Sequence, residues 1–152
     1  TSAVFVSAMN EKADELGLSK TMFKNSTGLD ISEEEAGAYG SARDVAYLME
    51  YLITKYPDAA ALTTLDMTTI PDIDGRYHVV KNTNQDVAGI HGLIASKTGY
   101  TLLSGGNLVI AVNIGLNRPF IIAILGSSTS GRFTDALTLL KEARIAAAQE
   151  SL

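Results

Sequence analysis

Hydrophobic residues recur at helical intervals in three segments of the chain. In residues 4–16 the apolar positions are four, four and three residues apart, which predicts one buried stripe along a helix that ends at Gly17. The stripe consists of Phe5, Met9, Ala13 and Leu16. A second helix is predicted between Ser41, which an acidic residue follows three positions later as in a capping box, and Pro57. A third helix is predicted from about Arg132, because the segment is rich in alanine.

Strand patterns are clearest in the last third of the chain. Three segments rich in apolar and β-branched residues are joined by short connections, which predicts an antiparallel meander. These segments are 94–101, 107–114 and 120–125, with a turn at 115–118 between the last two. Residues 61–80 predict two short strands around a turn at 71–75, and the polar residues 19–40 predict an extended loop with at most short strands. The elements together predict a mixed α and β fold.

Composition limits the classes of function. A chain of 152 residues with 46% apolar and 19% charged residues is typical of one domain. A net charge of −5 argues against a nucleic-acid partner, which requires a clustered basic face. The longest apolar runs are far shorter than the roughly 20 residues that cross a bilayer. The absence of cysteine excludes disulfides, thiolate metal sites and a cysteine nucleophile.

Several common catalytic patterns are missing from the sequence. Neither His78 nor His91 is followed four residues later by a histidine or a carboxylate, so a helical zinc site is not predicted. No glycine-rich phosphate loop of the Walker type and no Gly-x-Ser-x-Gly nucleophile elbow occurs. We therefore expect no metal and no cofactor.

One short motif carries chemistry. Residues 96–101 read Ser-Lys-Thr-Gly-Tyr-Thr on a predicted strand, and Lys-Thr-Gly is one of three motifs of penicillin-binding proteins and class A β-lactamases. A purely structural interpretation is an exposed edge strand in which Lys97 prevents edge-to-edge pairing. The rest of the chain favours the catalytic interpretation, because it contains several more stretches that resemble penicillin-binding proteins and that occur in the same order. They are residues 5–29, 41–44, 82–84, 105–109, 125–127 and 131–133.

This succession closely resembles the low-molecular-mass penicillin-binding proteins of the D-alanyl-D-alanine carboxypeptidase family, over nearly the whole chain. The resemblance implies an α+β, penicillin-binding protein/β-lactamase-like fold in which helices flank an antiparallel sheet. It also implies a serine acyl-enzyme acting outside the cytoplasm, in the periplasm or at the cell surface. The implied substrates are peptidoglycan stem peptides ending in D-Ala-D-Ala, and β-lactam antibiotics are implied as further ligands.

The sequence also departs from the family. No serine is followed by lysine at the third position, so the Ser-x-x-Lys motif of the nucleophile is absent, and Ser-x-Asn is absent as well. Both motifs lie upstream of this region in the family. The resemblance therefore implies that residues 1–152 are the C-terminal part of one D,D-peptidase catalytic domain. We expect the chain to be inactive alone, and to pair with an upstream segment or self-associate along residues 120–125.

The resemblance assigns roles to the Lys-Thr-Gly strand. Lys97 would place its ammonium in the cleft, where a cation favours both the substrate carboxylate and proton transfer. Thr98 would offer its hydroxyl to that carboxylate, and Gly99 would let the substrate backbone lie against the strand. The N–H of Tyr100 would be one donor to the oxyanion.

A second segment is expected at the substrate. Thr83 stands where some family members have an arginine that helps to bind the substrate carboxylate, and threonine cannot supply that charge. For the flanking Asn82 and Asn84 a binding role and a purely structural role in the loop remain equally open. Three charged residues of the other shared segments are interpreted as helix caps and core. They are Arg43, Asp44 and Arg132.

Two other functions remain open on these residues. A non-catalytic peptidoglycan-binding or regulatory module would keep the groove without the nucleophile. A D,D-endopeptidase or β-lactamase of the same fold would share the same motif. Labelled penicillin distinguishes the module from an enzyme, and linear against cross-linked stem peptides distinguish the two peptidases.

Overall fold

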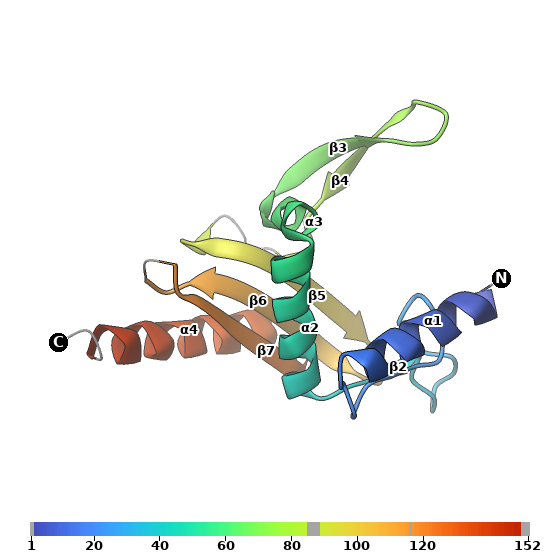
Figure 1. The fold of residues 1–152 in the computed structure, drawn as a ribbon, viewed down its shortest axis with the longest axis horizontal. Helices are drawn as coiled ribbons and strands as arrows, with labels where there is room; N and C mark the ends of the chain where they lie inside the picture. The colour runs from blue at the N-terminus through green and yellow to red at the C-terminus, as the bar shows by residue number, and fades with distance from the viewer. Residues whose placement is uncertain (1, 85–88, 116, 150–152) are drawn as a thin grey trace.

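The computed structural model describes residues 2–84, 89–115 and 117–149. In chain order its elements are α1 (Ser2–Glu15), β1 (Met22–Phe23), β2 (Ala38–Tyr39), α2 (Ala42–Lys55), α3 (Pro57–Ala61), the 3-10 helix η1 (Leu62–Thr64), β3 (Met67–Pro71), β4 (Tyr77–Lys81), β5 (Leu93–Thr101), β6 (Gly105–Asn113), β7 (Pro119–Ser127) and α4 (Gly131–Gln149) (Figure 1). The three long helices, the late meander and the short strand pair before it are confirmed. Of the predicted turn at 115–118, residue 116 lies outside the described residues.

The main sheet is the antiparallel meander β5-β6-β7, with β6 in the centre. In its register Lys97 lies opposite Val109, and Gly99 lies opposite Asn107. Within the described residues, β5 and β7 each have a strand neighbour on one side only. The Lys-Thr-Gly motif therefore lies on an edge strand.

A helix covers each face of this sheet (Figure 1). Side chains alternate along β6, so Ile110 faces α4 and Ala111 faces α2. The α4 side is filled by large residues such as Phe133, and the α2 side by Met49 against small residues. Burying each large apolar side chain contributes about 1.5–3 kcal/mol. An antiparallel sheet flanked by helices is thus confirmed.

The start of α2 follows the capping pattern that the sequence predicts. The backbone N–H of Asp44 donates to Ser41 Oγ at 3.1 Å. The Asp44 carboxylate in turn accepts from the Lys20 N–H at 2.8 Å and the Thr21 hydroxyl at 2.9 Å, joining the loop after α1 to α2. Burial alone would raise the pKa of Asp44, but these hydrogen bonds outweigh burial and hold the pKa below its ordinary value.

The apolar stripe of α1 is only partly covered. Ala13 is buried, but Phe5 keeps 59% of its surface exposed and borders a groove to which Phe23 and Leu48 also contribute. In Figure 1, α1 lies to one side of the sheet rather than over it. The helix is where the sequence predicts it, but Phe5 is not core within the described chain.

Two antiparallel strand pairs lie outside the main sheet, β1 with β2 and β3 with β4, and the second pair forms a hairpin that projects from the body (Figure 1). Its tip is held by Asp72, whose carboxylate accepts from the backbone and side chain of Arg76 and contacts His78 Nε2 at 2.9 Å.

No helix in the described part of the chain is both long and apolar enough to cross a membrane.

Candidate active site

Strand β5 presents the Lys-Thr-Gly motif at the open edge of the sheet. Lys97 and Gly99 are exposed and lie on the same face of the sheet as Ala95, which packs against α2. Thr98 points to the opposite face of the sheet and is only 9% exposed. The Lys97 Nζ donates to the carbonyl oxygen of Thr98 at 2.5 Å. The ammonium is thus solvent-accessible and lies along the strand edge.

The backbone of β5 directs alternate amide groups to the outer edge. The Ser96 N–H donates to Thr63 Oγ1 at 2.9 Å, and the Ser96 hydroxyl donates to the Thr63 carbonyl at 3.1 Å. Thr63 belongs to η1, which is not part of the sheet, so the Ser96 N–H points away from β6. Because backbone groups of residues two apart point the same way in a strand, the Tyr100 N–H also faces the outer edge.

The segment after β4 meets β5 at Thr98. The hydroxyls of Thr83 and Thr98 are 2.5 Å apart, which brings two of the predicted site residues together. Asn82 instead donates from Nδ2 to the carbonyl oxygens of Thr63 and Leu65, at 2.8 and 2.9 Å, and its Oδ1 accepts from the N–H of residue 84. These contacts favour the structural role for Asn82, which ties its loop to η1.

Asn84 lies deeper in the same segment. It is only 1% exposed, so its side chain is part of the interior rather than of an accessible surface. A direct contact between this side chain and a substrate is therefore not favoured by the structure. Thr83, between Asn82 and Asn84, contacts the Lys-Thr-Gly strand through its hydroxyl.

The fold leaves room at Gly99. A Cβ atom built on this residue would meet only Asn107 Cβ, at 3.7 Å, which is an ordinary van der Waals contact. At Gly106, on the neighbouring strand, a Cβ atom would come within 2.2 Å of the Ser128 carbonyl oxygen. The sheet therefore requires glycine at 106 but not at 99, and the glycine of the motif needs another explanation.

Arg132 is a site neighbour that the sequence did not reveal. It is buried at the start of α4, as expected of a helix-start and core residue, but Nη1 also donates to the Gly99 carbonyl oxygen at 2.7 Å. The two residues are 33 positions apart, so no local pattern connects them. The sequence marked Arg132 only through its place in the shared Gly-Arg-Phe segment at residues 131–133.

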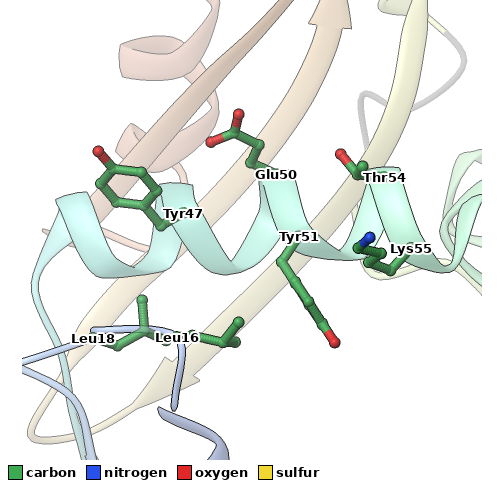
Figure 2. A pocket seen from close by; sticks show the side chains of 7 residues that line it. All are labelled: Leu16, Leu18, Tyr47, Glu50, Tyr51, Thr54 and Lys55. Carbon is green, nitrogen blue, oxygen red and sulfur yellow. The ribbon is translucent and has the colours of Figure 1, made fainter. Parts of the chain in front are cut away.

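A pocket of about 270 Å³ lies elsewhere, between α2 and the end of α1 (Figure 2). It is lined by Leu16, Leu18, Tyr47, Glu50, Tyr51, Thr54 and Lys55. None of these residues belongs to β5 or to segment 82–84, so the pocket is separate from the Lys-Thr-Gly edge. In the described residues no group of three or more His, Asp or Glu side chains could hold a metal ion.

An antiparallel sheet with a helix on each face and Lys-Thr-Gly on its edge strand is the β-lactamase-like fold of penicillin-binding proteins. The chain is similar to penicillin-binding protein D2 of Listeria monocytogenes in its ampicillin-bound form, with a TM-score of 0.75 and 27% identity over 91% of this chain and 55% of that one. The family model described as D-alanyl-D-alanine carboxypeptidase matches residues 1–129. The chain therefore belongs to the D-alanyl-D-alanine carboxypeptidase family.

Two curated relatives show how much of a family member is present. The chain is 37% identical to the D-alanyl-D-alanine carboxypeptidase DacF of Bacillus subtilis over 126 residues, which are 82% of this chain and 31% of that protein. It is 32% identical to a D-alanyl-D-alanine endopeptidase of Haemophilus influenzae over 138 residues, 90% of this chain and 45% of that protein. The chain thus spans about a third to a half of the length of these relatives.

Proposed function

We propose that residues 1–152 are the C-terminal part of the catalytic domain of a serine-type D-alanyl-D-alanine carboxypeptidase that acts outside the cytoplasm. The reaction removes the terminal D-Ala from peptidoglycan stem peptides through an acyl-enzyme. The observation that carries the proposal is the open edge of β5, where Lys97, the Thr98 hydroxyl and the outward Tyr100 N–H lie within four consecutive residues.

The nucleophile would come from a segment outside these 152 residues, because neither Ser-x-x-Lys nor Ser-x-Asn occurs in them. When the serine oxygen bonds to the penultimate D-Ala carbonyl carbon, the electron pair of the C=O bond moves to its oxygen, and the serine proton passes to a base. The Tyr100 N–H would donate to that oxygen. The Lys97 ammonium would stabilise anionic groups in the cleft and assist proton transfer.

The pair formed by Thr83 and Thr98 would bind the substrate carboxylate. Each hydroxyl carries one proton, and one proton is used within the pair, so one O–H donor remains for the substrate. Together with Lys97 this provides one neutral donor and one cation. Gly99 would let the substrate backbone add to the strand edge, as in other strand-addition complexes.

Penicillin acylation is the direct test. We expect the complete natural protein to form a stable covalent adduct with fluorescent penicillin, and the 152-residue chain alone to form none by mass spectrometry. An adduct on any serine of the isolated chain would contradict the assignment of the nucleophile to another segment. A complete protein that is never labelled would instead favour a non-catalytic peptidoglycan-binding module.

An endopeptidase is the second candidate, because one relative of 32% identity carries that name. A carboxypeptidase cleaves the amide bond that holds a terminal D-Ala with its free carboxylate. An endopeptidase cleaves the amide bond that joins two stem peptides in a cross-link. Rates on linear and cross-linked stem peptides of matched sequence separate the two. We expect faster D-Ala release from the linear peptide, and the reverse order would assign the endopeptidase.

A further inference from the structure

Arg132 is a buried cation whose partners are backbone oxygens. It is 8% exposed, and Nη1 lies 2.7 Å from the Gly99 carbonyl oxygen and 3.4 Å from that of Asn107. Its guanidinium carbon lies 4.8 Å from the centre of the Phe133 ring. Within the described residues no carboxylate is in ion-pair range of Arg132, and its Nε has no hydrogen-bond partner.

This arrangement is a poor way to gain stability. Burial removes the guanidinium from water, and none of the described residues supplies a counter-ion that compensates for the loss. A neutral apolar residue would fill the same space without that cost. The arginine therefore requires an explanation in what it does to the Gly99 carbonyl.

The geometry of one peptide group supplies that explanation. Gly99 lies opposite Asn107, and the same Nη1 reaches both carbonyl oxygens, so the Gly99 oxygen points toward β6. In a planar trans peptide the C=O and the next N–H point in opposite directions. Holding the Gly99 oxygen toward β6 thus also directs the Tyr100 N–H to the outer edge of β5. The Ser96 N–H points to the same edge.

We propose that Arg132 is a positioning residue that orients and polarises the Gly99–Tyr100 peptide, so that its N–H is a preorganised oxyanion donor. This inference rests on the proposed function. A cation at the carbonyl end draws electron density from the peptide and strengthens its N–H as a donor, because linked hydrogen bonds polarise one another. Donors that need no reorientation during the reaction are the ones that stabilise a developing negative charge most.

The experiment measures penicillin acylation of the complete natural protein, with Arg132→Met, Arg132→Lys and Leu140→Ala. Leu140 lies in the same helix and the same core cluster as Arg132's neighbour Phe133, but no hydrogen bond of β5 depends on it. Losing one oxyanion donor typically slows reaction about 100- to 1,000-fold. Because Arg132→Met leaves the donor present but unaligned, we expect acylation to slow about 10- to 100-fold with unchanged non-covalent affinity.

The variants separate positioning from stability. Arg132→Lys keeps a cation that can donate to one carbonyl, so we expect an intermediate acylation rate. Leu140→Ala should lower the melting temperature without slowing acylation of the folded protein. If Arg132→Met does not fold, the acylation rate of Arg132→Lys is compared with that of the wild-type protein, provided that both have the same melting temperature.

Three results would overturn the inference. One is wild-type acylation rates in folded Arg132→Met or Arg132→Lys, which would remove the positioning role and leave the proposed function standing. Another is a change in affinity alone, which would make Arg132 a ligand for the substrate. The third is a wild-type protein that penicillin never acylates, which would remove the proposed function together with this role.

Discussion

Replacing Gly99 by alanine separates the requirements of the fold from those of the proposed reaction. The new methyl group would meet only Asn107 Cβ at 3.7 Å, and the backbone φ at Gly99 is not positive. Replacing glycine by alanine at a compatible position stabilises proteins by about 0.4–1 kcal/mol, because it lowers the conformational entropy of the unfolded chain. We expect Gly99→Ala to leave the free energy of unfolding of the 152-residue chain unchanged or to raise it by that amount.

The same methyl group would stand where the substrate backbone is proposed to lie. Displacing a reacting group by about 1 Å can cost on the order of 100-fold in rate. We therefore expect Gly99→Ala to lower kcat/KM of the complete protein for a D-Ala-D-Ala peptide about 100-fold. Urea unfolding measures the first effect, and D-alanine release measures the second.

Gly106→Ala is the matched control. Its methyl group would lie 2.2 Å from the Ser128 carbonyl oxygen, so the backbone has to shift. Overpacking of this kind costs about 1–3 kcal/mol, and we expect a corresponding loss in the free energy of unfolding. A Gly99→Ala chain as destabilised as Gly106→Ala, or a fully active Gly99→Ala protein, would refute the reasoning.

Three further outcomes follow from particular residues. Lys97→Ala should slow penicillin acylation of the complete protein about 100- to 1,000-fold, whereas Lys81→Ala on β4 should not, and equal rates for the two variants would put the cleft elsewhere. The pKa of Asp44 is lower in the folded chain than the unfolded-state value of about 3.9. Its carboxylate therefore stabilises the fold above about pH 3.9, and this contribution to stability is lost as the pH falls through the folded-state pKa. Asp44→Asn should therefore flatten the acid decline of Tm, and an unchanged decline would contradict this. Because β7 has an open edge within the described residues, the 152-residue chain should self-associate in light scattering, and Leu125→Lys should weaken the association. A wild-type chain that stays monomeric would contradict that prediction.

The helices and strands were predictable where one periodicity extends over a whole element. In β6 the strand was predicted from an unbroken apolar run at residues 108–112, but that run does not show that Ile110 faces α4 and Ala111 faces α2. In α1 the stripe was clear, but Phe5 remains exposed. Periodicity shows which side of a helix is apolar, and it does not show what packs against that side.

The site was predictable only as far as its motif. Lys-Thr-Gly located the strand, and the shared Asn-Thr-Asn segment pointed to Thr83, which does contact Thr98. The contacts of Thr63 and Arg132 with the same strand join residues 33 positions apart in each case. Such contacts are set by how the sheet and its helices pack, so no local sequence pattern encodes them.

The two interpretations of Lys97 describe one requirement of this edge. A strand that accepts a substrate backbone must keep its outer N–H and C=O groups unpaired, and such an edge also attracts other strands. On β5 the part near Ser96 is covered by Thr63 of η1, and within the described residues no strand pairs with the outer edge from Thr98 to Tyr100. An exposed lysine beside the open part disfavours pairing with another sheet, because pairing would bury its charge. Under the proposed function the same lysine would attract a peptide that brings its own carboxylate, so Lys97 would both protect the edge and select what binds there.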